Sequence, residues 1–481
     1  MHYFDLGLIL LYLIGITWFG AHFRKRQKSL KDYFLGGKTT PWWAIGFSIV
    51  SAETSTLTVI GTPALSFQGN FGFLQVVFGY LLARVVISAL FMPHYFRGEL
   101  FTAYELMQRR FGLRLRRVTA GTFLLLRALA EGVRVFAISI VVAIVLGTGE
   151  IASIVVIVCL TLFYTFEGGM TAVIWTDVVQ MFLYVGGAIL SLFVMLGQID
   201  GGWQAVVSAA AAAGKLQLFD FRLEPTMEFL SRQYSFWAGV LGGCFLTTAS
   251  HGTEQLMVQR LLAARNISDA RKALFGSWAV IFFQFTLFLV IGLILWKHYL
   301  DSGAAAPQPA DRIYPEFIWN SLPAGARGLV IAAILAAAMS NLSAALNSLA
   351  STTVMDFYKL KFSHHSEAHY LRLARMATLG WGVVLFAIGV LSRQVKSVLE
   401  AGLGIASILY GALLGVFVLG VLTRRVSEKS AMIGMLAGLC VNLYLRFATP
   451  VAWTWYVLVG TLMTVAVSLA ASAVLDREEA H

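Results

Sequence analysis

The chain has 481 residues, of which 58% are hydrophobic and only 13% are charged. Its mean hydropathy is +0.76. These values exclude a soluble globular domain, in which about 25% of residues are charged. The net charge is +11, and the distribution of Lys and Arg along the chain decides what this charge means.

Apolar segments that are long enough to cross a bilayer recur from end to end, since a spanning helix needs about 20 residues. The longest connections between them, 198–233 and 297–327, are too short to form a soluble domain. The sequence therefore predicts an all-α polytopic membrane protein with thirteen transmembrane helices. Their expected bounds are 3–22, 40–64, 72–93, 119–146, 150–167, 172–197, 234–258, 274–296, 328–356, 371–391, 398–422, 430–446 and 451–475.

Most of the 36 Lys and Arg residues fall in alternate loops of this arrangement. Arg116 and Arg260 are counted among these loop residues. Cytoplasmic loops of membrane proteins carry an excess of Lys and Arg, so the N-terminus is expected outside and the C-terminus inside. The positive charge of the chain therefore indicates its orientation in the membrane and does not predict nucleic-acid binding. Three of these basic loops lie at 23–39, 94–118 and 423–429.

The first apolar segment is expected to remain as a helix, because no basic stretch precedes it and no small-residue cleavage site follows. The three cysteines, Cys159, Cys244 and Cys440, all fall within predicted spans. They therefore predict neither a disulfide framework nor a metal cluster.

Few ionisable residues lie inside the predicted spans. Such residues are costly in a bilayer and usually mark functional sites. The sequence has no Gly-rich phosphate loop, no zinc-ligand spacing and no nucleophile–base pattern, so it predicts a transporter and no enzyme. The residues are Glu53, Arg84, Arg127, Glu131, Arg134, Asp177, His251 and Glu254.

A polar stripe runs along the predicted helix at 328–356. Ser340, Ser343, Asn347 and Ser351 are spaced by three, four and four residues, so they share one helix face. Hydroxyl and amide groups that face lipid are costly, so this face must contact protein, water or a ligand. Packing between helices is the simpler explanation, and a ligand site is the alternative.

Two predicted spans are polar in the middle. Segment 46–63 carries seven Ser, Thr and Glu residues before Gly61 and Pro63, and segment 242–255 is polar at a similar depth around Thr247 and Gly252. Broken helices at corresponding positions of two halves mark the binding site of inverted-repeat transporters. Continuous helices with polar packing faces are the alternative.

Six segments resemble the sodium:solute symporter family, which includes transporters of proline, sialic acid, sugars, iodide, vitamins and monocarboxylates. The resemblance implies a LeuT-like fold, with an extra N-terminal helix in 1–22, a five-helix repeat in 40–197, an inverted repeat in 234–422 and two C-terminal helices in 430–475. It also implies Na⁺-coupled symport of a solute into the cell by alternating access. The matching segments are DYFLGGKTTPWW (32–43), FTAYELMQRRFG (101–112), FEGGMTAVIWTDVVQ (166–180), QRLLAARN (259–266), MSNLSAALNSLASTTVMDFY (339–358) and TRRVSEKSAMIGMLAGL (423–439).

The resemblance implies a main Na⁺ site between the first broken helix and the serine-rich helix. Its ligands would be the carbonyls of Ser51, Thr54 and Ala337 and the side chains of Ser340 and Asn341. Oxygen ligands suit a hard cation, and an unwound helix frees carbonyls to supply them. Asn341 departs from the Ser or Thr that the family usually has.

A second Na⁺ site is implied near Asp177, with Ser343 and Asn347 as partners. Family members with this site offer a hydroxyl where this chain has Ala344. A structural carboxylate, or a stepping-stone for a departing cation, is the alternative role for Asp177.

The solute is expected between the broken helices and the helix that carries Arg127, Glu131 and Arg134, which share one face. A neutralised cluster would be structural, whereas an Arg left over would favour an anionic solute. Glu53 argues against an anion unless it pairs with an Arg. We expect a small polar organic solute, with carboxylates among the candidates. Further contacts chosen by depth alone are Thr58, Thr247, His251 and Gln255.

Proton coupling is the main alternative to Na⁺ coupling, since Asp177, His251 and Glu53 can all carry protons. A passive channel is less consistent with paired broken helices. Na⁺ is the expected coupling ion, and no organic cofactor, nucleic acid or obligate protein partner is expected beside the solute and the lipid bilayer. The expected location is the plasma membrane, or the inner membrane of a Gram-negative bacterium.

Overall fold

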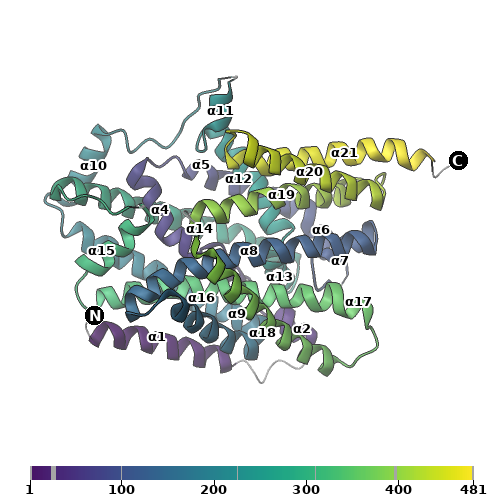
Figure 1. Cartoon of the computed structure of the whole chain (residues 1–481), viewed down its shortest axis with the longest axis horizontal. Coiled ribbons are helices and arrows are strands. Elements are labelled where there is room, and N and C mark those ends of the chain that lie inside the picture. Colours follow the sequence, from purple (N-terminus) through teal and green to yellow (C-terminus); the bar gives the residue numbers. More distant parts are fainter. Residues whose placement is uncertain are drawn as a thin grey trace.

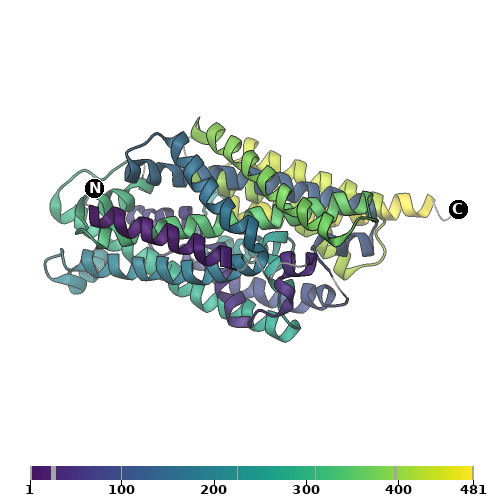
Figure 2. The ribbon, with the colours of Figure 1, turned by 90° about the horizontal axis from the view of Figure 1, so that it is seen from below.

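A computed structural model describes residues 3–22, 29–98, 100–224, 226–308, 310–394 and 398–478. These residues form helices and connecting loops, with an isolated β-bridge between Thr40 and Ala264. The long helices run roughly along the long axis of the molecule, and helices α1 (Tyr3–Ala21) and α21 (Tyr456–Glu478) lie on opposite sides of it (Figures 1 and 2).

The remaining long helices fall into two groups of similar order along the chain. The first group contains α3 (Trp42–Glu53), α4 (Thr56–Gln68), α5 (Leu74–Val86), α8 (Leu113–Leu146) and α9 (Glu150–Leu196). The second contains α12 (Phe236–Gly252), α13 (Gln255–Leu262), α14 (Ile267–Ser302), α16 (Ala326–Thr353), α18 (Glu367–Leu391) and α19 (Val398–Leu422), and α20 (Glu428–Ala448) precedes α21.

Short helices lie at the two ends of the bundle. Helices α10 (Gly202–Ala212) and α15 (Ile313–Ser321) lie at the end where α1 begins, and α7 (Tyr104–Arg110) and α17 (Lys359–Lys361) lie toward the end that α21 approaches (Figure 1). The connections at 198–233 and 297–327 therefore share one end of the molecule.

Nine helices within the described residues are long and apolar enough to cross a membrane, or ten if the bent pair α3–α4 is one span. Three other predicted spans correspond to helices that are not counted among these nine. Helix α8 carries Arg127, Glu131 and Arg134, α12 has 17 residues, and segment Glu150–Phe163 of α9 is short.

Helix α9 is interrupted at the boundary between two of the predicted spans. Gly169 has φ 56° and ψ −156° inside the helix, a conformation that favours glycine. The two predicted spans at 150–167 and 172–197 are therefore two arms of one bent helix.

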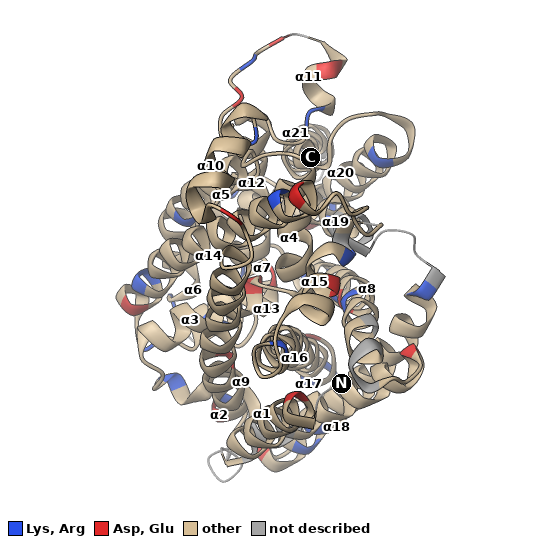
Figure 3. Ribbon diagram, turned by 90° about the vertical axis from the view of Figure 1, so that its left-hand side faces the viewer, with Lys and Arg blue, Asp and Glu red and all other residues tan. Residues whose placement is uncertain are grey.

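Helix α16 lies in the interior, ringed by α1, α8, α9 and α18 (Figure 3). In its apolar segment 94% of the residues are buried. The Asp5 carboxylate of α1 accepts hydrogen bonds from the amides of Gly325 and Gly328 at 2.7 and 3.0 Å, and so stabilises the N-terminus of α16. The polar stripe of α16 thus faces other helices and never lipid.

Candidate functional site

The first broken helix ends where its hydroxyl residues compete for backbone hydrogen bonds. Helix α3 ends at Glu53, Thr54 has extended backbone angles (φ −83°, ψ 110°), and α4 begins at Thr56 at an angle of 65°. Ser55 starts α4 as a capping box with Thr58. The break predicted in segment 46–63 is confirmed, and it exposes backbone carbonyls beside α16.

The second break lies within the predicted segment 242–255, directly after Gly252. Helix α12 continues through Thr247 and Gly252, and the backbone leaves the helix at Thr253 and Glu254 before α13 begins. The Thr253 hydroxyl donates to the Ala249 carbonyl at 2.7 Å, and so satisfies one carbonyl of the last turn of α12 where the helix ends.

Three serines and a carboxylate meet beside the first break. The Ser340 hydroxyl of α16 donates to Asp177 Oδ1 of α9 at 2.6 Å, and Ser51 Oγ of α3 lies 2.6 Å from Ser340 Oγ. Ser48 Oγ donates to Asp177 Oδ2 at 2.5 Å. All four side chains are buried. The cluster therefore joins α3, α9 and α16 through oxygen atoms.

Asn341 contacts the carbonyls that the break exposes. Its side-chain amide nitrogen donates to the carbonyls of Ala52 at 2.8 Å and Thr54 at 3.3 Å. Its Oδ1 atom is buried and has no hydrogen-bond partner. Ser51, Thr54, Ser340 and Asn341, four of the five expected main-site residues, are thus close together, and the orphaned oxygen fits a site for a cation.

Ala337, the fifth of these residues, is buried one turn before Ser340 and Asn341 on the same helix. Gln284 of α14 donates to Thr54 Oγ1 at 2.6 Å and so fixes the extended residue between α3 and α4. These neighbours hold the carbonyl-bearing segment against α16.

The residues expected at a second Na⁺ site have partners within the protein. Ser343 Oγ donates to the Ser340 carbonyl at 2.9 Å. Asn347 Oδ1 accepts from Gln259 Nε2 at 2.6 Å. Asp177 forms an ion pair with Arg260 of α13, with Arg260 Nη2 2.9 Å from Oδ2. The sequence analysis assigned Arg260 to a loop, and the structure corrects this, because its side chain is only 1% exposed.

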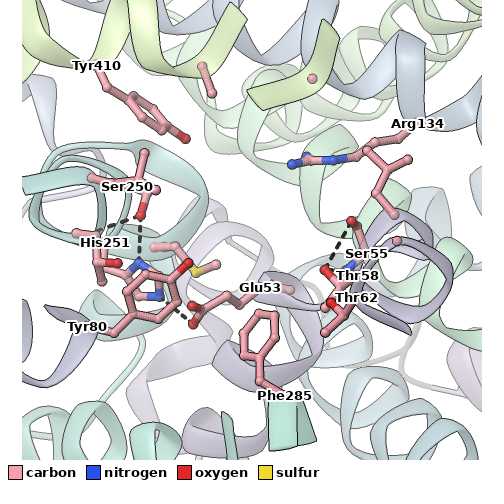
Figure 4. A pocket seen from close by; sticks show the side chains of 18 of the residues that line it. Glu53, Ser55, Thr58, Thr62, Tyr80, Arg134, Ser250, His251, Phe285 and Tyr410 are labelled. Atoms are coloured by element: carbon pink, nitrogen blue, oxygen red, sulfur yellow. Dashed lines mark hydrogen bonds and ion pairs between the residues drawn. The ribbon is translucent and has the colours of Figure 1, made fainter. Parts of the chain in front are cut away.

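A cavity of about 170 Å³ lies between the two breaks (Figure 4). It is smaller than the ~300–1,000 Å³ of sites for drug-sized ligands. Glu53, Tyr80 and His251 lie on one side and Arg134 and Ser55 on the other. Its walls come mainly from α3, α4, α5, α8, α12, α13, α14 and α19, so both groups of helices contribute.

Six of the eight expected solute contacts line this cavity, and two do not. Glu131 lies behind Arg127 and Arg134, and Gln255 is turned away. The Gln255 side chain accepts from the Ala103 amide and donates to the Phe101 carbonyl, at 2.8 and 3.0 Å. The depth of Gln255 in its predicted span therefore did not predict the direction in which its side chain points. The six that line the cavity are Glu53, Thr58, Arg127, Arg134, Thr247 and His251.

Sequence reasoning missed the aromatic part of the cavity wall. These residues come from segments without polar patterning, so no signal in the sequence distinguishes them from ordinary core residues. Glu254 was recognised only as an ionisable residue within a span. The missed residues include Phe73, Tyr80, Tyr234, Phe285, Tyr410 and Trp453.

The Glu53 carboxylate is paired inside the protein through its Oε2 atom. It pairs with Arg84 Nη2 at 3.2 Å and with His251 Nε2 at 3.0 Å. Ser250 Oγ lies 2.8 Å from His251 Nδ1. Since a carboxylate accepts, Nε2 carries the proton toward Glu53, and Nδ1 accepts from Ser250 when the ring is neutral. Glu53 therefore does not confer a free negative charge on the cavity.

The arginines of α8 differ in how well they are paired. Arg127 forms a close ion pair with Glu254, which also accepts a hydrogen bond from Tyr410. Arg134 has one nitrogen 3.0 Å from Glu131, and its buried Nε has no partner. Its side chain is 25% exposed and reaches the cavity (Figure 4). Arg134 is thus the arginine with donors to spare.

A model of the sodium:solute symporter family matches residues 33–438. The chain belongs to this family. The sodium/sialic acid symporter NanT of Aliivibrio fischeri is 28% identical over 95% of this chain and 90% of its own. Human sodium-coupled monocarboxylate transporter 2 is 27% identical over 92% of this chain and 72% of its own. The human sodium/iodide cotransporter is 28% identical over 98% of this chain and 74% of its own.

Solved structures agree with this assignment. A substrate-bound, outward-open Na⁺-coupled sialic acid symporter superposes with a TM-score of 0.89 at 26% identity and covers 98% of both chains. Mhp1, a nucleobase-cation-symport-1 family transporter, superposes with a TM-score of 0.57 at 14% identity over 91% of this chain, which shows the fold alone. The predicted LeuT-like, all-helical fold and the symporter class are confirmed. This family member is a multi-pass membrane transporter, not an enzyme.

Proposed function

We propose that this sodium:solute symporter couples the entry of Na⁺ to the uptake of a small organic carboxylate. The single observation that carries the choice of solute is Arg134, whose Nε has no partner although it is buried beside the cavity. A guanidinium with free donors matches a carboxylate better than any other common group. The engagement of Glu53 by Arg84 and His251 removes the main objection to an anion.

The size of the cavity and its apolar rings limit the solute further. Phe73, Tyr80 and Phe285 contribute aromatic surface, while Ser55 and Thr58 contribute hydroxyls beside Arg134. A short carboxylate would place its charged end on Arg134 and its carbon chain against the rings. Two relatives are named for sialic acid and for monocarboxylates, both of which are carboxylates.

We propose that one Na⁺ is held by the carbonyls of Ser51, Thr54 and Ala337 together with the side chains of Ser340 and Asn341. The orphaned Oδ1 atom of Asn341 supports this proposal. In the structure the amide group of Asn341 bonds to the carbonyls of Ala52 and Thr54, so a turn of this side chain would free them and bring Oδ1 into the site. A Na⁺ held there would be shared between the carbonyls of the broken segment and the side chains of α16.

We further propose thirteen transmembrane helices with the N-terminus outside, as a five-helix repeat and its inverted copy with one helix before and two after. The matching breaks in α3–α4 and α12–α13 support the repeat. The location would be the plasma membrane, which is the inner membrane if the source is a Gram-negative bacterium. No organic cofactor or protein partner is part of this proposal.

Proton coupling is the second candidate, and the Glu53–His251 pair favours it, because an imidazole and a carboxylate 3.0 Å apart in the cavity can exchange a proton with a bound solute. In that case uptake would follow a pH gradient without Na⁺.

The solute class is tested with Arg134→Gln in proteoliposomes. We expect the half-saturating concentration of a transported carboxylate to rise about ten- to a hundredfold, since a charge-assisted hydrogen bond contributes ~1.5–3 kcal/mol. The neutral amide of the same solute should bind both proteins equally weakly. Arg114→Gln, an exposed arginine on the same helix, is the matched control. Unchanged carboxylate affinity in Arg134→Gln would refute the assignment.

A further inference from the structure

The ion pair between Arg260 and Asp177 occupies the place where a second Na⁺ is expected. Arg260 lies on α13, and Asp177 lies on α9, 83 positions away in sequence. Arg260 Nη2 is 2.9 Å from Asp177 Oδ2, and the two side chains are 1% and 0% exposed. Both charges are therefore removed from water and face each other.

Every nitrogen of the Arg260 guanidinium has an acceptor. Nε donates to Ser48 Oγ at 2.9 Å, Nη1 donates to the Leu256 carbonyl at 2.8 Å, and Nη2 donates to Asp177. Ser48 in turn donates to the same carboxylate oxygen at 2.5 Å. A guanidinium held by three acceptors is a fixed part of the site and not a passing contact.

The oxygen atoms that a second cation would need are already used. Asp177 accepts from Ser48, Ser340 and Arg260. Ser343 donates to a backbone carbonyl, and Asn347 Oδ1 accepts from Gln259, which lies next to Arg260 on α13. At position 344 the chain has alanine, which offers no side-chain oxygen.

Electrostatics disfavours a second cation in direct contact with this carboxylate. A buried carboxylate requires one compensating positive charge, and Arg260 supplies it. A second cation within a few ångströms of the guanidinium would be repelled strongly, because the surroundings are of low dielectric constant.

We propose that Arg260 is a tethered cation that permanently takes the place of a second Na⁺ at Asp177, so that this symporter binds one Na⁺ per solute. The inference rests on the proposed function for the presence of the first Na⁺. It concerns the number of Na⁺ ions moved per solute. Because each Na⁺ that enters the cell adds the free energy of its gradient to the driving force, this number sets the steepest solute gradient that the protein can sustain.

The test counts ²²Na⁺ bound at saturation to purified protein. The wild type should bind one Na⁺ with a Hill coefficient near one. Arg260→Gln leaves Asp177 without its cation and should bind one Na⁺ more than the wild type, with a Hill coefficient above one. Arg265→Gln is the matched control: this exposed arginine five positions along the chain donates to the Thr39 carbonyl, and its removal should change neither number.

The double variant Arg260→Gln/Asp177→Asn removes both charges and should bind the same number of Na⁺ as the wild type. The double variant keeps the test decisive if Arg260→Gln does not fold. If the wild type did hold a Na⁺ at Asp177, the double variant would bind one Na⁺ fewer than the wild type. Two ions on the wild type, or no extra ion on folded Arg260→Gln, would overturn the inference. A wild type that binds no Na⁺ refutes the proposed function instead, and the extra ion on Arg260→Gln still decides the role of Arg260.

Discussion

Ser340→Ala is the perturbation that separates a sodium ligand from a packing serine. The Ser340 hydroxyl is buried and lies 2.6 Å from both Asp177 Oδ1 and Ser51 Oγ. Alanine removes the hydroxyl oxygen and offers no other ligand in its place. Losing one such ligand should cost about 1–3 kcal/mol of binding free energy, which is roughly a ten- to hundredfold rise in half-saturating Na⁺.

The assay is the increase in melting temperature of the purified protein as Na⁺ is added, alongside Na⁺-dependent uptake in proteoliposomes. Binding to the folded state alone raises stability with ligand concentration, so the midpoint of this increase reports affinity. Ser348→Ala is the matched control, since Ser348 is equally buried on α16 and its hydroxyl donates only to the Ala345 carbonyl. A Ser340→Ala protein with lower thermal stability but an unchanged Na⁺ midpoint would refute the reasoning and assign Ser340 to packing.

Three further predictions follow from other parts of the site. Glu53→Gln leaves Arg84 buried without a carboxylate, so the free energy of unfolding should fall by about 3–5 kcal/mol; an unchanged melting temperature would show that this pair contributes nothing. Asn341→Ser removes the amide that bonds to the exposed carbonyls, so half-saturating Na⁺ should fall, by roughly tenfold for 1.4 kcal/mol, whereas a rise would make Asn341 the better ligand. In a cysteine-free background, a membrane-impermeant thiol reagent added to intact cells should label Leu223→Cys and not Arg114→Cys, and the reverse would invert the topology.

The local features of the site could be predicted from the sequence. The hydroxyl-rich segment around Thr54 breaks its helix, and this follows from residues close together in the chain. The contact between the serine face of α16 and that break was implied by the family resemblance. The second break also lies within its predicted segment 242–255, directly after Gly252.

Partners between distant helices could not be predicted. Arg260 was counted as a loop cation and is the buried partner of Asp177, and Arg116, counted in the same way, is the buried partner of Asp356 at 2.7 Å. A charge near the end of a span has the same sequence signature whether it faces water or an interior carboxylate. Only the packing of helices distinguishes the two.

The central claim is that a Na⁺ gradient drives the uptake of a small carboxylate, and one measurement tests it most directly. Purified protein in proteoliposomes is given a panel of radiolabelled carboxylates, from monocarboxylates to sialic acid, with an inward Na⁺ gradient, an inward proton gradient without Na⁺, or neither. The account predicts that at least one carboxylate accumulates above its outside concentration only when the Na⁺ gradient is imposed. Accumulation under the proton gradient in the absence of Na⁺ would contradict it.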